Sequence, residues 1–131
     1  MRVFETANRP AFFLYRDDLR MNFGTLMLFS RAARSQIPAD ALAHCIGSVL
    51  VAPLYSTSLE QYRDCMAADL DSAFFTLLLG VRALRVRAAQ RPGAAVFMSS
   101  AAARIGTPNH EVVAAAKGGL ESLVRAAAAT A

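Results

Sequence analysis

The hydrophobic pattern of the chain changes between short apolar runs and longer stretches with helical spacing. Three apolar runs bounded by Gly, Pro or acidic residues predict strands, at 11–15, 41–45 and 94–99. Three stretches with apolar residues three and four apart predict helices, at 21–36, 59–90 and 110–129. The order strand, helix, strand, helix, strand, helix favours an α/β fold, with three parallel strands and covering helices.

Start and stop signals mark several ends of these elements. Ser58 followed by Gln61 forms a capping box, which predicts the start of one long helix that accommodates a bend. Asn109, with Glu111 in the first turn, is expected to cap the last helix. Residues 1–10 have no periodicity and are expected to form an irregular tail before a domain over 11–131. The strand at 11–15 either pairs with the strand at 41–45 or leaves an open sheet edge.

Composition limits the class of protein. A chain of 131 residues with 55% hydrophobic content is expected to form one globular domain. The net charge of +4 comes from arginines scattered along the chain, so we expect no nucleic-acid partner. The longest apolar stretch, 73–81, is about half a membrane span, so we expect no membrane partner and a cytoplasmic location. Cys45 and Cys65 have neither metal-type nor redox-type spacing, and we expect free thiols and no metal.

The stretch 94–117 carries the clearest candidate chemistry. Its apolar run delivers Ser99 and Ser100 to the end of a predicted strand, and the only lysine of the chain, Lys117, follows. Ligands bind at the carboxyl ends of parallel strands, so these side chains are candidates for a site. Ser100 either donates a hydrogen bond to a substrate oxygen or satisfies the backbone of the next turn. Lys117 is interpreted as functional, because a compact ammonium on an alanine-rich helix suits hydroxyl contacts.

This stretch resembles the active-site segment of the short-chain dehydrogenases/reductases, in which a strand ends in Ser-Ser and a helix carries Tyr-x-x-x-Lys. Ser100 and Lys117 fall at the expected places, but Val113 fills the position of the tyrosine. The run from His44 through Cys45 and Ile46 to Gly47 resembles the Asn-Asn-Ala-Gly signature of the family.

Two acidic positions keep the same register. Asp69 stands where the family has its active-site asparagine, and Asp18 with Leu19 matches the pair that contacts the adenine of the cofactor. Asp69 either accepts hydrogen bonds from a water or is an exposed helix acid. His44 either lines the cofactor cleft or caps a strand.

The resemblance implies a truncated Rossmann-like fold and an oxidoreductase that uses NAD or NADP to transfer hydride to or from a carbonyl, alcohol or enoyl group. It implies catalytic roles for Ser100, Lys117 and Asp69. Near Lys117, the sequence is similar to the enoyl-acyl-carrier-protein reductases, with His110 at their tyrosine position. His110 is therefore either an acid/base or a solvated loop histidine. The cofactor-binding residues that the resemblance implies are Asp18, Leu19, His44, Cys45, Ile46, Gly47 and Lys117.

The resemblance covers only the middle of a family member. The Gly-rich turn that holds the cofactor pyrophosphate has no counterpart in this sequence, so the chain is expected to be inactive alone and to bind the cofactor weakly or not at all. In a full-length parent the substrate would be a small molecule. Family dimers pair the helices equivalent to 59–90 and 110–129, so the resemblance implies a homo-oligomer. The alternative function is a non-catalytic dimerising module that pairs through the same two helices.

Overall fold

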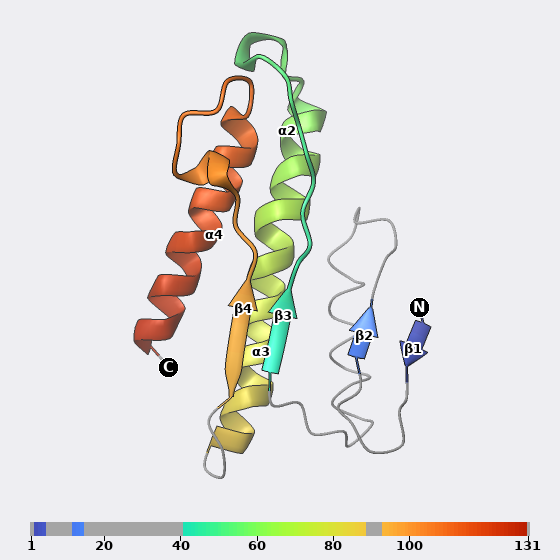
Figure 1. Cartoon of the computed structure of the whole chain (residues 1–131), viewed down its shortest axis with the longest axis vertical. Coiled ribbons are helices and arrows are strands. Elements are labelled where there is room, and N and C mark those ends of the chain that lie inside the picture. Colours follow the sequence, from blue (N-terminus) through green and yellow to red (C-terminus); the bar gives the residue numbers. More distant parts are fainter. Residues whose placement is uncertain (1, 5–11, 15–40, 89–92, 131) are drawn as a thin grey trace.

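The computed structural model describes residues 2–4, 12–14, 41–88 and 93–130. Four strands in this part form two separate two-stranded sheets (Figure 1). Strands β1 (Arg2–Phe4) and β2 (Phe12–Leu14) pair antiparallel. Strands β3 (Ala41–His44) and β4 (Ala94–Phe97) pair parallel. The parallel pair confirms the predicted α/β class, and both of its strands lie where the apolar runs placed them.

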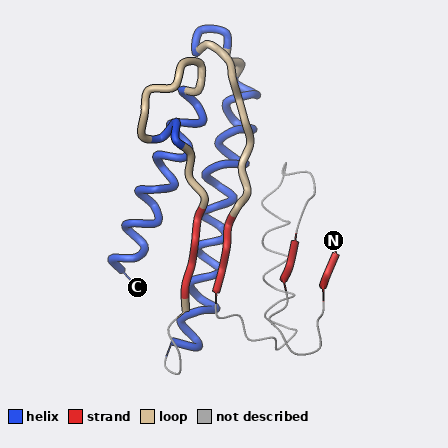
Figure 2. The backbone as a smooth tube through the Cα atoms, in the orientation of Figure 1, coloured by secondary structure: helices blue, strands red, loops and turns tan. Residues whose placement is uncertain are grey.

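A long helical column connects β3 to β4 and lies against them (Figures 1 and 2). It begins after the short helix η1 (Leu54–Ser56) and runs through α2 (Leu59–Met66), the π-helical segment η2 (Ala67–Asp71) and α3 (Ser72–Ala88). The Ser58 side chain accepts from the Gln61 backbone while the Gln61 side chain accepts from the Ser58 backbone. The predicted capping box is therefore confirmed. The wide turn of η2 interrupts the regular helix in its middle.

The last helix, α4 (Glu111–Thr130), follows η3 (Ala101–Ala103) and a loop. The expected cap at Asn109 is wrong. Asn109 has a left-handed backbone with φ of 62°, which asparagine tolerates, and its carbonyl accepts from the Ala52 backbone at 3.0 Å. The first helical bond instead runs from the Ala114 N–H to the His110 carbonyl at 2.8 Å, so His110 is the cap residue and the helix begins at Glu111.

The core of the described residues lies where α2, η2 and α3 meet α4 and η3. The apolar residues of this core are almost completely buried: Cys65, Ala68, Ala73, Leu77, Ala102, Val112, Val113, Ala116 and Leu120. Gly119 of α4 faces the helical column, because a methyl group at this position would lie 3.3 Å from Leu70 of η2. Small residues here let α4 approach the helical column closely.

Two other expectations need correction or fall outside the described residues. The irregular tail is wrong at Arg2–Phe4, which forms β1, and the third parallel strand is not confirmed, because β2 pairs antiparallel with β1. Local patterning marked β2 as a strand but carries no information on its partner. The predicted helix at 21–36 and the pair Asp18 and Leu19 lie outside the described residues. Among the helices that are described, none has the length and apolar character needed to cross a bilayer.

Candidate functional site

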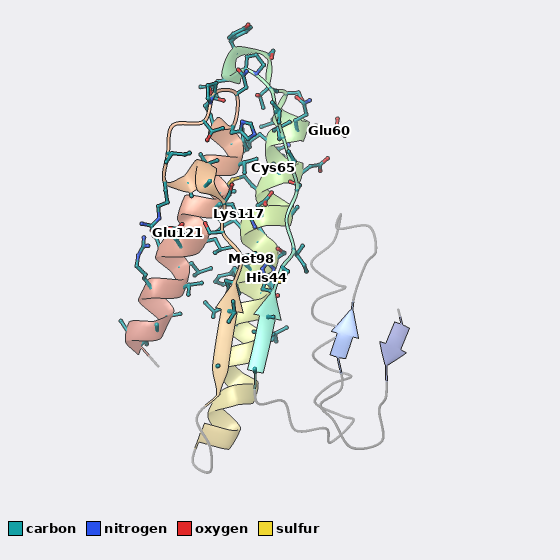
Figure 3. All side chains as sticks on the ribbon, viewed as in Figure 1. His44, Glu60, Cys65, Met98, Lys117 and Glu121 are labelled. Atoms are coloured by element: carbon teal, nitrogen blue, oxygen red, sulfur yellow. The ribbon has the colours of Figure 1, made fainter. Side chains whose placement is uncertain are left out.

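The carboxyl ends of β3 and β4 lie side by side, and one further backbone bond, from Met98 N–H to the His44 carbonyl at 2.9 Å, extends their pairing. Beyond this point the segments that follow β3 and β4 separate and continue as loops (Figure 2). The side chain of Lys117 reaches the same place from α4 (Figure 3). The structure therefore brings the lysine to the strand ends, as the sequence predicted.

The Lys117 ammonium is surrounded by three acceptors. It donates to the Ile46 carbonyl at 3.0 Å and to the Met98 carbonyl at 3.1 Å, which belong to the loops after β3 and β4. Its third neighbour is Asp69 Oδ1 at 3.3 Å. Two of its N–H groups therefore donate to backbone carbonyls, and Asp69 supplies the opposite charge. The side chain is 7% exposed, and the lysine therefore belongs to the interior of the site.

Asp69 belongs to η2 and is the most buried charged residue described, with 0% exposure. Besides Lys117, its carboxylate accepts from the Ser48 backbone N–H at 3.1 and 3.2 Å and from the Ser48 hydroxyl at 2.6 Å. The Cys65 thiol lies 3.4 Å from Oδ2 and donates to it. Burial raises the pKa of the Cys65 thiol, and the neighbouring carboxylate adds to the rise. The carboxylate thus has a full set of donors, and the expected exposed helix acid is not observed.

Gly47 fits closely over this pair. A Cβ at position 47 would lie 2.7 Å from Asp69 Oδ1 and 2.9 Å from Lys117 Nζ, closer than carbon atoms normally approach. Its φ is not positive, so the glycine is needed here for space and not for backbone conformation. The absence of a side chain allows the two charges to meet beside the β3 loop.

His44 faces the helical column and not a cleft. It is 2% exposed, its ring stacks on Phe97 with centroids 5.3 Å apart, and Nε2 lies 3.1 Å from Ser72 Oγ. The Ser72 hydroxyl donates to the Ala68 carbonyl, so Nε2 carries the proton and donates to Ser72. Nδ1 has no partner. Burial is the main cause that lowers the His44 pKa from 6.5 to about 4, and Lys117 adds to it.

Ser100 makes its side-chain hydrogen bond within its own turn. Its hydroxyl accepts from the Ala102 backbone N–H at 3.2 Å, which corresponds to the backbone-satisfying alternative. Next to it, the Ser99 hydroxyl donates to Glu121 at 2.8 Å, and Arg104 lies 2.7 Å from the same carboxylate. The Ser99 hydrogen bond is the main cause that lowers the Glu121 pKa.

The two positions at which the resemblance places a proton donor, His110 and Val113, differ in their surroundings. His110 Nδ1 lies 2.7 Å from the Pro108 carbonyl and donates to it, so Nε2 is left to accept. His110 lies seven residues before Lys117, about 10 Å along the helix axis. Val113 is buried at 5% exposure and packs with Val112 and Cys65. The tyrosine position of the resemblance is therefore part of the apolar core.

The structure thus gathers some predicted residues and separates others. Lys117, Asp69, Ile46 and Gly47 form one cluster, whereas His44 points to the helical column. Sequence reasoning missed Ser48 and Cys65, whose signals were only their positions, one residue after Gly47 and one helical turn before Asp69.

Two residues expected to bind the dinucleotide are turned to the interior. The Lys117 ammonium, expected to bind ribose, donates to two backbone carbonyls and is paired with Asp69, and His44, expected to line the cofactor cleft, is buried. Cys45 and Gly47 are exposed at the end of β3. The described residues therefore do not fit NAD or NADP by themselves.

Comparisons with known proteins agree with the fold. The profile of the family described as enoyl-(acyl carrier protein) reductase matches residues 12–131. A search of curated proteins gives no match. Many solved structures match, and this chain spans about half the length of those described next.

Three of these structures illustrate the similarity. A metagenomic short-chain oxidoreductase in complex with NADP has a TM-score of 0.76 and 20% identity, over 86% of this chain and 50% of that one. An oxidoreductase from E. coli has a TM-score of 0.75 and 23% identity, over 88% and 47%. 4-Hydroxyisoleucine dehydrogenase complexed with NADH has a TM-score of 0.73 and 18% identity, over 87% and 49%. At these identities the likeness concerns the fold, which is Rossmann-like.

Proposed function

Since the chain belongs to the short-chain dehydrogenase/reductase family, we propose that it is the central part of an NAD(P)-dependent oxidoreductase domain and is inactive alone. The whole domain would transfer hydride between the nicotinamide and a carbonyl, alcohol or enoyl group. The observation that carries the proposal is the meeting of two parallel strand ends with Lys117 and the exposed Gly47, at the edge where α/β sheets bind ligands.

Three features support inactivity of the isolated chain. The sequence contains no Gly-rich turn to hold a pyrophosphate, the Lys117 ammonium is buried among Ile46, Met98 and Asp69, and Val113 cannot donate a proton. General acid catalysis requires a proton donor within hydrogen-bond reach of the substrate oxygen. Among the described residues, the Nδ1 proton of His110 already goes to the Pro108 carbonyl.

Two measurements test this proposal. First, the purified chain is titrated with NADPH and NADH by fluorescence, and absorbance at 340 nm is followed with an aldehyde, a ketone and an enoyl thioester. We expect no turnover, and cofactor consumption matched by product would contradict inactivity.

Second, residues 41–130 replace the corresponding segment of a related short-chain oxidoreductase that supplies the remaining strands. We expect this chimera to bind NADPH, more weakly than its parent. A chimera that folds and binds no NADPH would contradict the assignment to a cofactor-binding domain.

A second candidate function, a dimerising module, is supported by exposed apolar side chains on the helical column. Tyr62, Phe74 and Leu78 expose 44%, 45% and 40% of their surface, and a methyl group at Gly118 of α4 would meet nothing within 4 Å. Large exposed apolar residues on neighbouring helices are typical of helix-pairing surfaces. Sedimentation equilibrium over a range of concentrations tests it, and a strictly monomeric chain would rule it out.

A further inference from the structure

The contact between Asp69 and Lys117 gives the cluster a role that goes beyond the proposed function and does not depend on it. We propose that Asp69 is a positioning residue that locks the Lys117 side chain in the interior. In this position the lysine joins the loops after β3 and β4 to the helical column and is withheld from solvent and from ligands.

The contacts given for the ammonium are all to groups of the protein. The carbonyls of Ile46 and Met98 each accept a hydrogen bond from it, and the Asp69 carboxylate forms an ion pair with it at 3.3 Å. A ligand hydroxyl that displaced one of these groups would leave it buried without its partner, which is costly. The lysine is therefore held by protein groups alone.

The charges of Lys117 and Asp69 also favour this buried position. Side-chain exposures of 7% for Lys117 and 0% for Asp69 place both charges in an environment of low polarity. A buried ammonium needs a counter-charge, and the carboxylate of Asp69 supplies it at 3.3 Å. With an amide at position 69, the two carbonyls would face a buried ammonium without a counter-ion. The lysine would then gain free energy by turning its side chain toward water.

Gly47 fits closely against the contact between Lys117 and Asp69. A methyl group at this position would lie within 3 Å of both partner atoms, although neither charge would be altered. Gly106 offers a matched control, since it too is an exposed glycine with no positive φ, and a methyl group there would meet nothing within 4 Å. A methyl group at position 47 therefore disturbs the contact between Asp69 and Lys117 by its bulk, without a change of charge.

Lys117 can be followed without ambiguity, because it is the only lysine of the chain. The intact protein is treated with formaldehyde and dimethylamine-borane, which methylate free ε-amines, and the modification of the peptide that contains Lys117 is timed by mass spectrometry. The rate for the chain unfolded in urea serves as the reference. We expect the native rate to be about 100-fold lower than this reference, as for a group held by a buried ion pair.

Asp69→Asn and Gly47→Ala are each expected to raise the native rate about tenfold or more, because each weakens the contact, and Gly106→Ala is expected to leave it unchanged. Circular dichroism confirms that each variant is folded. The rate is also measured at several low urea concentrations. Release of a locked side chain gives a rate that does not depend on urea, whereas reaction through global unfolding gives a rate that rises with it.

Two results would overturn the proposal. One is a native Lys117 that is methylated as fast as in the unfolded chain. The other is an unchanged rate in both folded variants, Asp69→Asn and Gly47→Ala, since Lys117 would then be held without help from Asp69. If the methylation rate of Lys117 rises in these variants only when urea is added, the increase comes from lower global stability. This result would count against a local lock.

Discussion

Asp69 Oδ1 lies 3.3 Å from Lys117 Nζ, in a place where neither side chain has appreciable contact with solvent. The two residues are far apart in the sequence, and they link η2 of the helical column to α4. Lys117 also holds the loops after both parallel strands through their carbonyls. The pair therefore connects three parts of the described fold at a single point, and the stability of the fold should depend on it.

Removing one charge of this pair is expected to destabilise the protein strongly. Lys117→Met leaves the Asp69 carboxylate buried without its cation, and we expect the free energy of unfolding to fall by about 3–5 kcal/mol. Asp69→Asn should cost less, about 2 kcal/mol, because the amide oxygen still accepts from Ser48. Urea unfolding of the wild type, both single variants and the double variant gives the coupling energy.

The double variant should lose less stability than the sum of the two single losses, because no unpaired buried charge is left. A fully additive cycle would show that the two residues do not interact. Arg125→Met is the control, because Arg125 takes part in an ion pair with Glu121 at the surface. Surface pairs contribute little, so this variant should unfold close to the wild type.

The elements around this pair could be predicted from the sequence, but the pair itself could not. The strands β3 and β4 and the capped start of α2 depend on local apolar spacing and on the Ser58 and Gln61 side chains, which the sequence displays directly. The site depends on contacts between distant residues. The resemblance placed Asp69 and Lys117 separately, and nothing in the pattern indicated that the π-helical turn would bring the carboxylate to the ammonium.

The difference between local sequence patterns and contacts between distant residues also explains the predictions that were wrong. The apolar run of β2 predicts a strand, yet the choice of β1 as its antiparallel partner depends on pairing that no local signal sets. Asparagine is a typical helix cap, but the carbonyl of Asn109 accepts a hydrogen bond from the distant Ala52. The cap position therefore falls one residue later, at His110. Ser48 and Cys65 were missed because their role depends on the hydrogen bonds that they donate to the Asp69 carboxylate in the folded chain.

Acid is expected to destabilise the fold through His44. The native state holds this imidazole neutral, with its pKa lowered to about 4, while the unfolded chain has the ordinary value of 6.5. Between these values the unfolded state binds more protons, so stability falls as pH falls from 6.5 to 4. The contribution is complete above pH 6.5, and the loss is at most about 3 kcal/mol.

His44→Phe separates this effect from the titration of carboxyl groups. Phenylalanine can stack on Phe97, it removes the unpartnered Nδ1, and Ser72 still donates to Ala68. We expect the variant to match the wild type approximately at pH 7 and to lose less stability between pH 7 and pH 4.5. Equal losses in the two proteins, measured by urea unfolding at both pH values, would show that His44 does not titrate in this range.

Restoring the family tyrosine is expected to harm this chain. Val113 packs against Val112 and Cys65 in the core, and a tyrosine there needs space for its ring and a partner for its hydroxyl. We expect Val113→Tyr to lower the free energy of unfolding by about 1–3 kcal/mol, and Val113→Ile to lower it less. Thermal unfolding of the two variants measures this difference. NADPH turnover by the isolated Val113→Tyr chain would contradict the proposal that Lys117 is withheld.

If the chain dimerises through its helices, Phe74 should contribute to the contact. It is 45% exposed on α3 and lies one helical turn before the exposed Leu78. Burying an aromatic side chain at a helix pair contributes about 1.5–3 kcal/mol, so Phe74→Ser should weaken dimerisation about tenfold to a hundredfold. Tyr55→Ser is the control, because Tyr55 is 93% exposed in η1, outside the long helices. Sedimentation equilibrium gives the dissociation constants. A dimer weakened by Tyr55→Ser and not by Phe74→Ser would place the contact at the loop before α2, and the helix-pairing proposal would be wrong.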